Sequence, residues 1–271
     1  MKEMAARITG SVLLLAAMAA VYVVAVWTRP GQRVDQRLYE EMNGADSWRE
    51  LVHRIGFERV TDPRLWVVAG IVVVALGLLS RRRASIIPLL ILPVVGVVVA
   101  RALRTVILPR PELIDIIRAA YNTFPSGHTA AAAGCVAAAI RAAPRPLAPL
   151  GAVVGAFWVT LVGQGLMEVG AHRPSDVIGS LFMVGALLVL VPTSTRESGW
   201  GPVTAATVAV VGMVGPVLWS AYTGHAIVAA IGVVASLVFA ALTLGPTRTG
   251  PVTEPQAWPV DDRRAPSRLR R

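Results

Sequence analysis

Two short polar strings stand out in this chain, each at the edge of a long apolar segment. The first is Pro125-Ser126-Gly127-His128, and the second runs from His172 to Asp176. In the second string the histidine and the aspartate are four residues apart, and Pro174 suits the first turn of a helix, so both side chains are expected on one face. A histidine oriented by a carboxylate keeps one ring nitrogen free as a base or nucleophile. The spacing therefore predicts proton-transfer or nucleophilic chemistry at His172.

The chain just before the first string is rich in arginine. Four of these residues surround the end of one apolar segment and the loop after it: Arg101, Arg104, Arg110 and Arg118. Guanidinium groups fork onto phosphate oxygens and stay charged at any working pH. The turn at Gly127 leads into a helix whose first N–H groups are unpaired and suit an anion. An anion site is the functional interpretation; the structural one is that Glu112 and Asp115 neutralise the arginines.

Taken in order, these motifs resemble the type 2 phosphatidic acid phosphatase family of lipid phosphate phosphatases. The resemblance covers residues 65–193 and rests on Arg110-Pro111, Pro125 to His128, and His172 to Asp176. It implies an all-α transmembrane bundle of about six core helices, with a site that opens at the outer leaflet. It also implies a metal-independent hydrolase that acts on a lipid phosphate or diphosphate and needs no cofactor.

The resemblance also assigns roles to individual residues. His172 would be the nucleophile, Asp176 would orient it, and His128 would protonate the leaving alcohol. Arg110, Ser126 and Gly127 would hold the phosphate. An imidazole that attacks phosphorus forms a phosphohistidine, which water then hydrolyses, while arginines and backbone donors stabilise the phosphoryl oxygens without a metal.

Two positions depart from the family pattern, which is Lys-x6-Arg-Pro at the first motif and Ser-Arg-x5-His-x3-Asp at the third. The lysine position is Leu103, and the Ser-Arg pair falls on Gly165-Leu166. Arg104 and Arg173 are the neighbouring cations that would replace the missing ones. Without replacement, the loss of two charged contacts of about 1.5–3 kcal/mol each would leave a weak or inactive enzyme. The second hypothesis is therefore a non-catalytic lipid-phosphate binder or transport protein.

Composition sets the elements that must position these residues. The 271 residues are 55% hydrophobic and 15% charged, with a mean hydropathy of +0.62, which is too apolar for an ordinary soluble domain. This favours a membrane protein and disfavours a vanadate-dependent haloperoxidase, whose site pattern is related but whose architecture is normally soluble. Eight apolar segments are expected to span the membrane, near 8–28, 65–80, 86–103, 128–140, 148–168, 177–193, 202–222 and 225–244.

Basic residues predict the orientation. Arg81 to Arg83, Arg141, Arg145, Arg196 and the C-terminal arginines would share one side with the N-terminus, and this is the cytoplasmic side by the positive-inside rule. Both polar strings then face outside. These loops explain most of the net charge of +10, so membrane lipids rather than nucleic acid are the expected partners.

Four regions are expected along the chain. They are an N-terminal helix with an outer loop (1–64), a phosphatase-like core (65–193), two further membrane helices (194–244) and a disordered basic tail (245–271). The outer loop includes an amphipathic stretch at 48–55 and is given a lid or packing role. The candidate substrates are phosphatidate, phosphatidylglycerophosphate, and polyprenyl phosphates or diphosphates. A transporter without phosphate chemistry would leave the paired strings unexplained.

Overall fold

The computed structural model describes residues 2–43, 50, 60, 62–81, 83–115, 122–144 and 147–191. These parts of the chain are almost entirely helical and contain no strand. The long helices are α1 (Lys2–Trp27), α4 (Pro63–Leu79), α5 (Arg83–Ala102), α6 (Gly127–Ala142), α7 (Ala148–Glu168) and α8 (Pro174–Leu190). A shorter helix, α2 (Arg29–Met42), follows α1, and a π-helical turn, η2 (Leu103–Ile107), extends α5.

The long helices coincide with the first six apolar segments expected from the sequence. The prediction of an all-α chain is thus confirmed for the described residues. The last two predicted segments, near 202–222 and 225–244, and the basic tail lie outside these residues.

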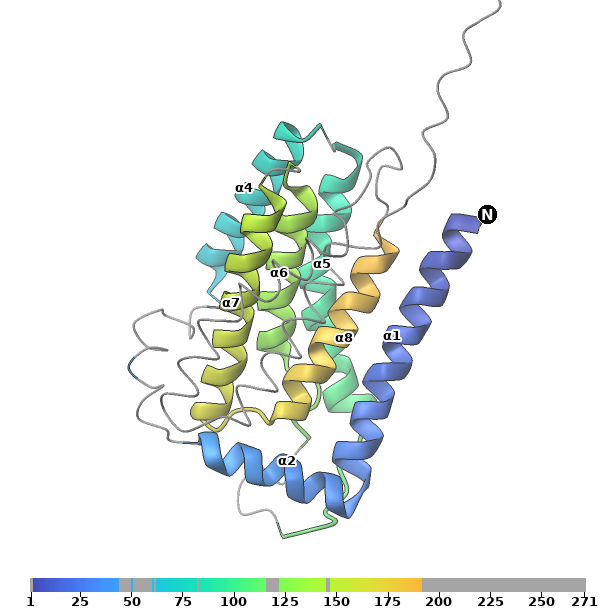
Figure 1. Cartoon of the computed structure of the whole chain (residues 1–271), viewed down its shortest axis with the longest axis vertical. Coiled ribbons are helices and arrows are strands. Elements are labelled where there is room, and N and C mark those ends of the chain that lie inside the picture. Colours follow the sequence, from blue (N-terminus) through green and yellow to red (C-terminus); the bar gives the residue numbers. More distant parts are fainter. Residues whose placement is uncertain are drawn as a thin grey trace, which may run out of the picture.

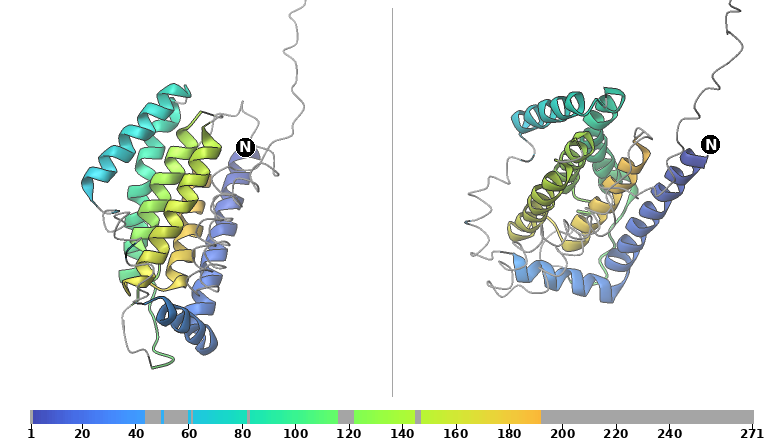
Figure 2. Two further views of the ribbon diagram at one scale, coloured as in Figure 1. Left: turned by 60° about the vertical axis from the view of Figure 1, so that its left-hand side comes forward. Right: turned by 45° about the horizontal axis from the view of Figure 1, so that its top comes forward.

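Helix α6 lies at the centre of the bundle (Figures 1 and 2), with α5 and α7 packed along it, while α1 packs along α8. Most of α6 is alanine and glycine, and nearly all of its small side chains are buried. A β-carbon added at Gly134 would come within 2.7 Å of the Pro93 Cα on α5. The small residues therefore allow the close backbone approach that membrane helix pairs use.

The outer surface of the bundle is apolar. Large side chains that point away from the core include Val67 on α4 and Ile87 on α5, which are 63% and 68% exposed. Two helical stretches, Met4–Trp27 and Arg83–Ile107, are long and apolar enough to span a membrane, and Pro63–Leu79 and Pro174–Leu190 are shorter apolar helices. These features favour association with a membrane, and the full set of crossings stays a prediction.

Both polar strings lie at one end of the bundle. Helices α5 and α7 end there, α6 and α8 begin there, and α2 lies across this end (Figure 1). The N-terminus and the turn between α4 and α5 lie at the other end. The two strings therefore meet at one end of the bundle, and the side of the membrane that this end faces stays a prediction.

Helix α2 differs from the outer loop expected over residues 29–64. Thr28 caps its start by accepting a hydrogen bond from the Gly31 N–H at 3.0 Å, and Pro30 occupies its first turn. Its buried face carries polar side chains that find partners at this end of the bundle: Gln32, Asp35, Gln36 and Tyr39. Most of the amphipathic stretch at 48–55 lies outside the described residues.

Candidate active site

The imidazole of His172 is held by a carboxylate. Its Nδ1 lies 3.2 Å from Oδ2 of Asp176, and both side chains are buried. The same carboxylate oxygen accepts a hydrogen bond from the Arg173 N–H at 2.9 Å, which fixes the start of α8. Because Nδ1 faces the carboxylate, Nε2 is the ring nitrogen left for chemistry. The structure thus brings His172 and Asp176 together, as their spacing predicted.

A second histidine faces the first. His128 stands in the first turn of α6, and its ring centroid lies 6.1 Å from that of His172, at an interplanar angle of 67°. The two strings are joined directly, since the Ser126 N–H donates to the Asp176 carbonyl at 3.3 Å. The Ser180 hydroxyl lies 2.9 Å from the Ser126 carbonyl and 2.7 Å from that of Asp176. These contacts hold the two histidines at a fixed separation.

A pocket of about 610 Å³ opens beside His172. The residues that line it are Arg104, Thr105, Asn122, Thr123, Ala171 and His172. The side chain of Asn122 ties its walls together, because the amide donates to the Leu108 carbonyl at 2.6 Å and to the Phe124 carbonyl at 3.1 Å. Arg104 therefore shares a pocket with His172, although it lies one residue from the register of the family's lysine.

The guanidinium group of Arg110 is buried, and its hydrogen-bond donors are unused. Its side chain is 2% exposed, and the nearest acid is Asp35, whose Oδ2 lies 3.7 Å from one terminal guanidinium nitrogen. None of its three guanidinium nitrogens has a hydrogen-bond partner among the described residues. Burial and the nearby charge of Arg173 lower the pKa of Arg110, and Asp176 and Asp35 oppose this shift. A buried, charged group with unused donors is costly unless an anion meets it.

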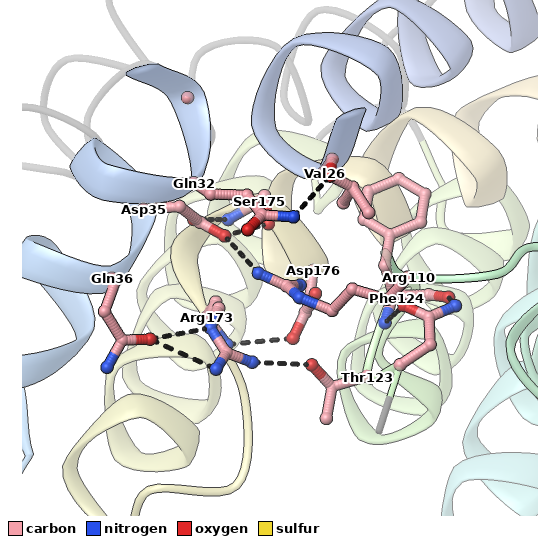
Figure 3. Close-up of polar contacts among 12 residues, drawn as sticks. Val26, Gln32, Asp35, Gln36, Arg110, Thr123, Phe124, Arg173, Ser175 and Asp176 are labelled. Carbon is pink, nitrogen blue, oxygen red and sulfur yellow. Dashed lines mark hydrogen bonds and ion pairs between the residues drawn. The ribbon is translucent and has the colours of Figure 1, made fainter. Parts of the chain in front are cut away.

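Arg173 is surrounded by other protein groups (Figure 3). Its Nε and one terminal nitrogen lie 3.2 and 3.1 Å from Oε1 of Gln36, and the other terminal nitrogen lies 3.4 Å from the Thr123 hydroxyl. The guanidinium also stacks over the ring of Tyr39, at 5.2 Å from its centroid. Arg173 thus lies behind Thr123, a pocket residue, and its direct contact with a phosphate stays a prediction.

Ser126 and Gly127 form the start of α6. The buried Ser126 hydroxyl accepts from the N–H of Thr129 at 3.2 Å and from its hydroxyl at 3.0 Å, so it serves as the helix cap. A β-carbon added at Gly127 would meet nothing within 4 Å. The N–H groups of Gly127 and His128 have no partner within the helix, and the space beside the Gly127 α-carbon is open.

The two departures from the family pattern are packing residues. Leu166 is buried in the hydrophobic core, and Leu103 packs against it. Arg118 lies outside the described residues, as do two of the four histidines of the chain, His53 and His225. Within the described ranges no three His, Cys, Asp or Glu side chains gather as metal ligands would.

The α2 side chains around the arginines were missed by the sequence interpretation. Asp35, Gln36 and Tyr39 contact Arg110, Ser175 and Arg173, which lie far along the chain. Their spacing of one, three and four residues is a helical one, and exposed Arg33 and Arg37 lie on the other face. This periodicity was the available signal for a helix with a buried polar face, although it did not identify the partners.

Comparison with known proteins supports the motif assignment. Residues 90–200 match the PAP2 superfamily. No curated protein and no solved structure matches the chain significantly. The matched region contains both histidines, the aspartate and the arginines Arg104, Arg110 and Arg173. The match at residues 90–200 confirms the resemblance to the type 2 phosphatidic acid phosphatases.

Proposed function

We propose that this protein is a membrane phosphatase that hydrolyses a lipid phosphate or diphosphate at the outer leaflet through a phosphohistidine intermediate. The superfamily match supports phosphatase activity on lipid phosphates. The observation that carries the mechanism is at His172, where Asp176 holds Nδ1 while the ring lines a pocket together with Arg104. A pocket of about 610 Å³ has the size of a small-molecule site and suits a phosphorylated headgroup.

The first chemical step transfers the phosphoryl group to His172. The Nε2 lone pair attacks phosphorus, and the bond between phosphorus and the leaving oxygen breaks. His128 donates a proton to that oxygen, so the lipid departs as an alcohol or, from a diphosphate, as a monophosphate. Asp176 stabilises the positive charge that develops on the His172 ring.

The second step releases phosphate. His128, now neutral, takes a proton from a water molecule that attacks phosphorus, and the bond between phosphorus and Nε2 breaks. Inorganic phosphate leaves, and both histidines return to their starting states. The two ring centroids lie 6.1 Å apart, which is close enough for both imidazoles to reach one phosphoryl group.

Cations and backbone donors would hold the phosphoryl oxygens. Arg110 offers buried guanidinium donors, and Arg104 offers a second guanidinium in the pocket. The open N–H groups at Gly127 add the positive end of α6. Ser126 would act through these N–H groups, since its hydroxyl caps the helix, and Arg173 would add positive charge behind Thr123.

A non-catalytic lipid-phosphate binder is the second candidate. It is motivated by Leu103 and Leu166, which replace two charged residues of the family pattern. The presence of Arg104 in the His172 pocket favours the enzyme, because one missing cation then has a replacement at the site. The nucleophile, its orienting acid and the facing histidine would have no use in a simple binder.

The test is phosphate release by the full chain purified in detergent, with chelator present and no added divalent metal. The substrates are phosphatidate, phosphatidylglycerophosphate, and polyprenyl phosphate and diphosphate. His172→Ala is the matched variant. We expect release from at least one lipid, a loss of at least about 10³-fold in the variant, and an acid-labile phosphoprotein in the wild type. Folded protein that binds these lipids without releasing phosphate would favour the binder.

A further inference from the structure

One carboxylate of α2 contacts two parts of the candidate site. Asp35 is buried, and its Oδ1 accepts a hydrogen bond from the Ser175 N–H at 3.0 Å. Its Oδ2 accepts from the Ser175 hydroxyl at 2.7 Å and lies 3.7 Å from the guanidinium of Arg110. Figure 3 shows Asp35 between these two partners. The phosphatase mechanism above assigns no role to this residue.

The contact with Ser175 places the start of α8. Ser175 is the second residue of this helix, and its N–H has no partner within the helix. Asp35 supplies that partner from another helix and also brings negative charge to the positive end of α8. The next residue is Asp176, which holds His172. The position of the nucleophile therefore depends on a contact made by α2.

The contact with Arg110 has a different character. At 3.7 Å it is an ion pair without a hydrogen bond, so the guanidinium keeps its N–H donors for a ligand. The negative charge of Asp35 nevertheless reduces the attraction of Arg110 for an anion. At this distance the carboxylate charge acts both on the guanidinium and on any anion bound to it.

We propose that Asp35 is a positioning residue that holds Arg110 against the start of α8 and whose charge sets the anion affinity of the site. The inference rests on the proposed function, since it takes the ligand of Arg110 to be a phosphoryl group. When Asp35 is ionised the site binds a dianion weakly and releases it readily. When Asp35 is neutral the same arginine binds the dianion more tightly.

The protonation state of Asp35 changes close to neutral pH. Burial, followed by the charge of Asp176, raises its pKa from 3.8 to about 6, and the Ser175 hydrogen bonds and Arg110 oppose this shift. The groups that face Asp35 are Arg110 from the loop after η2 and Ser175 and Asp176 from α8. His172 and Arg173 adjoin Asp176, and the neighbours Gln32 and Gln36 on α2 are neutral.

The sign of the effect follows from this pKa. Below about pH 6 Asp35 is protonated and neutral, so anion affinity is high. Affinity falls as pH rises through this value, because the new negative charge offsets Arg110. Two histidines also lie at the site. The contribution of Asp35 must therefore be read as a difference between two proteins that share both histidines.

The experiment measures sulfate binding to the full chain in detergent by calorimetry between pH 5 and pH 8. Sulfate resembles the phosphate dianion and keeps its charge over this range. Asp35→Asn keeps an oxygen for the Ser175 N–H and removes the charge. We expect it to bind sulfate about 10-fold more tightly than wild type at pH 7.5 and equally at pH 5. Asp115→Asn, at an exposed acid of the same loop as Arg110, is the matched control and should follow wild type.

A second variant covers the case in which Asp35→Asn fails to fold. Ser175→Ala removes a hydrogen bond that lowers the pKa of Asp35, so the pH at which sulfate affinity falls should move upward. A midpoint that does not move, or that moves downward, contradicts the proposal.

The remaining outcomes are also decisive. Equal affinities of wild type and Asp35→Asn at every pH, with phosphate release intact, would overturn the role of Asp35 and leave the proposed function standing. Weaker binding by Asp35→Asn at pH 7.5 would show that Asp35 acts only as a cap for α8. A folded wild type that neither binds sulfate nor releases phosphate would overturn both proposals.

Discussion

Two histidines and two arginines carry the proposed chemistry, and their surroundings give them different roles. His172 is buried and has its Nδ1 held by Asp176, whereas the facing His128 is half-buried in the first turn of α6. This asymmetry separates a nucleophile from a proton donor, although both are imidazoles. Arg110 is buried and Arg104 lines the open pocket, so the first is suited to a fixed phosphoryl oxygen and the second to an entering headgroup.

The role of His128 predicts a dependence on the leaving group. His128→Ala should slow formation of the phosphoprotein from a lipid phosphate by about 10² to 10⁴-fold, because the departing alkoxide needs a proton. The loss should be much smaller with p-nitrophenyl phosphate, whose leaving group departs unprotonated. Single-turnover labelling measures this step alone. Equal losses of phosphoprotein formation by His128→Ala with both substrates would contradict the general-acid assignment. His172→Ala should form no phosphoprotein with either substrate.

Arg104 is predicted to replace the missing lysine of the family pattern. Arg104→Ala should lower kcat/KM by about 10 to 10²-fold, as expected for one charged hydrogen bond to a phosphoryl group. Arg101→Ala is the matched control, since this arginine is exposed in the last turn of α5, just before η2, and it should stay within about twofold of wild type. Steady-state kinetics on the best lipid substrate compares the two. Similar losses of kcat/KM in both variants would show that the overall positive charge of this region matters, and not a specific contact of Arg104 in the pocket.

At the scale of elements, the site is built from helix starts that are locked to one another. The cap of α6 and the first turn of α8 share the contacts of Ser126, Asp176 and Ser180, and α2 closes the same end. Phe124, just before the first string, is fully buried, and its ring packs 5.3 Å from that of Tyr22 on α1. Displacement of one helix start should therefore disturb the histidines of both strings.

Gly179 tests this coupling. A β-carbon there would lie 2.3 Å from the Phe124 ring, which is fully buried and has no free space to move into. We expect Gly179→Ala to cost about 1–3 kcal/mol and to reduce phosphate release. Gly96→Ala is the control, because its nearest neighbours stand at 3.7 Å and alanine favours a helix. The melting temperature and the rate of phosphate release should both fall in Gly179→Ala and stay unchanged in Gly96→Ala. A stable and active Gly179→Ala would contradict the tight contact with Phe124.

The sequence predicted part of this arrangement. Counting apolar segments placed both strings at one end, and the spacing of His172 and Asp176 placed them on one face. The partners of α2 could not be predicted, since Asp35 and Ser175 are 140 residues apart and only the folded bundle brings them together. The sequence could not show that Arg104 faces the His172 pocket. Strict counting of residues assumes a regular helix, whereas the π-helical turn at Leu103–Ile107 changes the angle between successive side chains.

At the scale of the whole molecule, the bundle has the candidate site at one end and an apolar lateral surface. The long described helices alternate in direction, so Arg81, in the turn after α4, and Arg141, in the last turn of α6, lie opposite the site. The large apolar side chains exposed on the bundle lie between the two ends. This distribution suits a bilayer, with basic loops on one side and the headgroup pocket on the other. A lipid could then place its phosphate at the histidines while its tails stay among the helices.

This arrangement predicts which end of the molecule faces outside. In a Cys135→Ala background, which removes the single cysteine, Arg37→Cys on α2 marks the site end and Ala84→Cys at the start of α5 marks the opposite end. Both positions are exposed. A membrane-impermeant maleimide applied to intact cells should label only Arg37→Cys, and both should react after permeabilisation. Labelling of Ala84→Cys alone would place the site in the cytoplasm, because a charged reagent cannot cross the hydrocarbon core to reach the buried side. The substrate would then have to come from the inner leaflet.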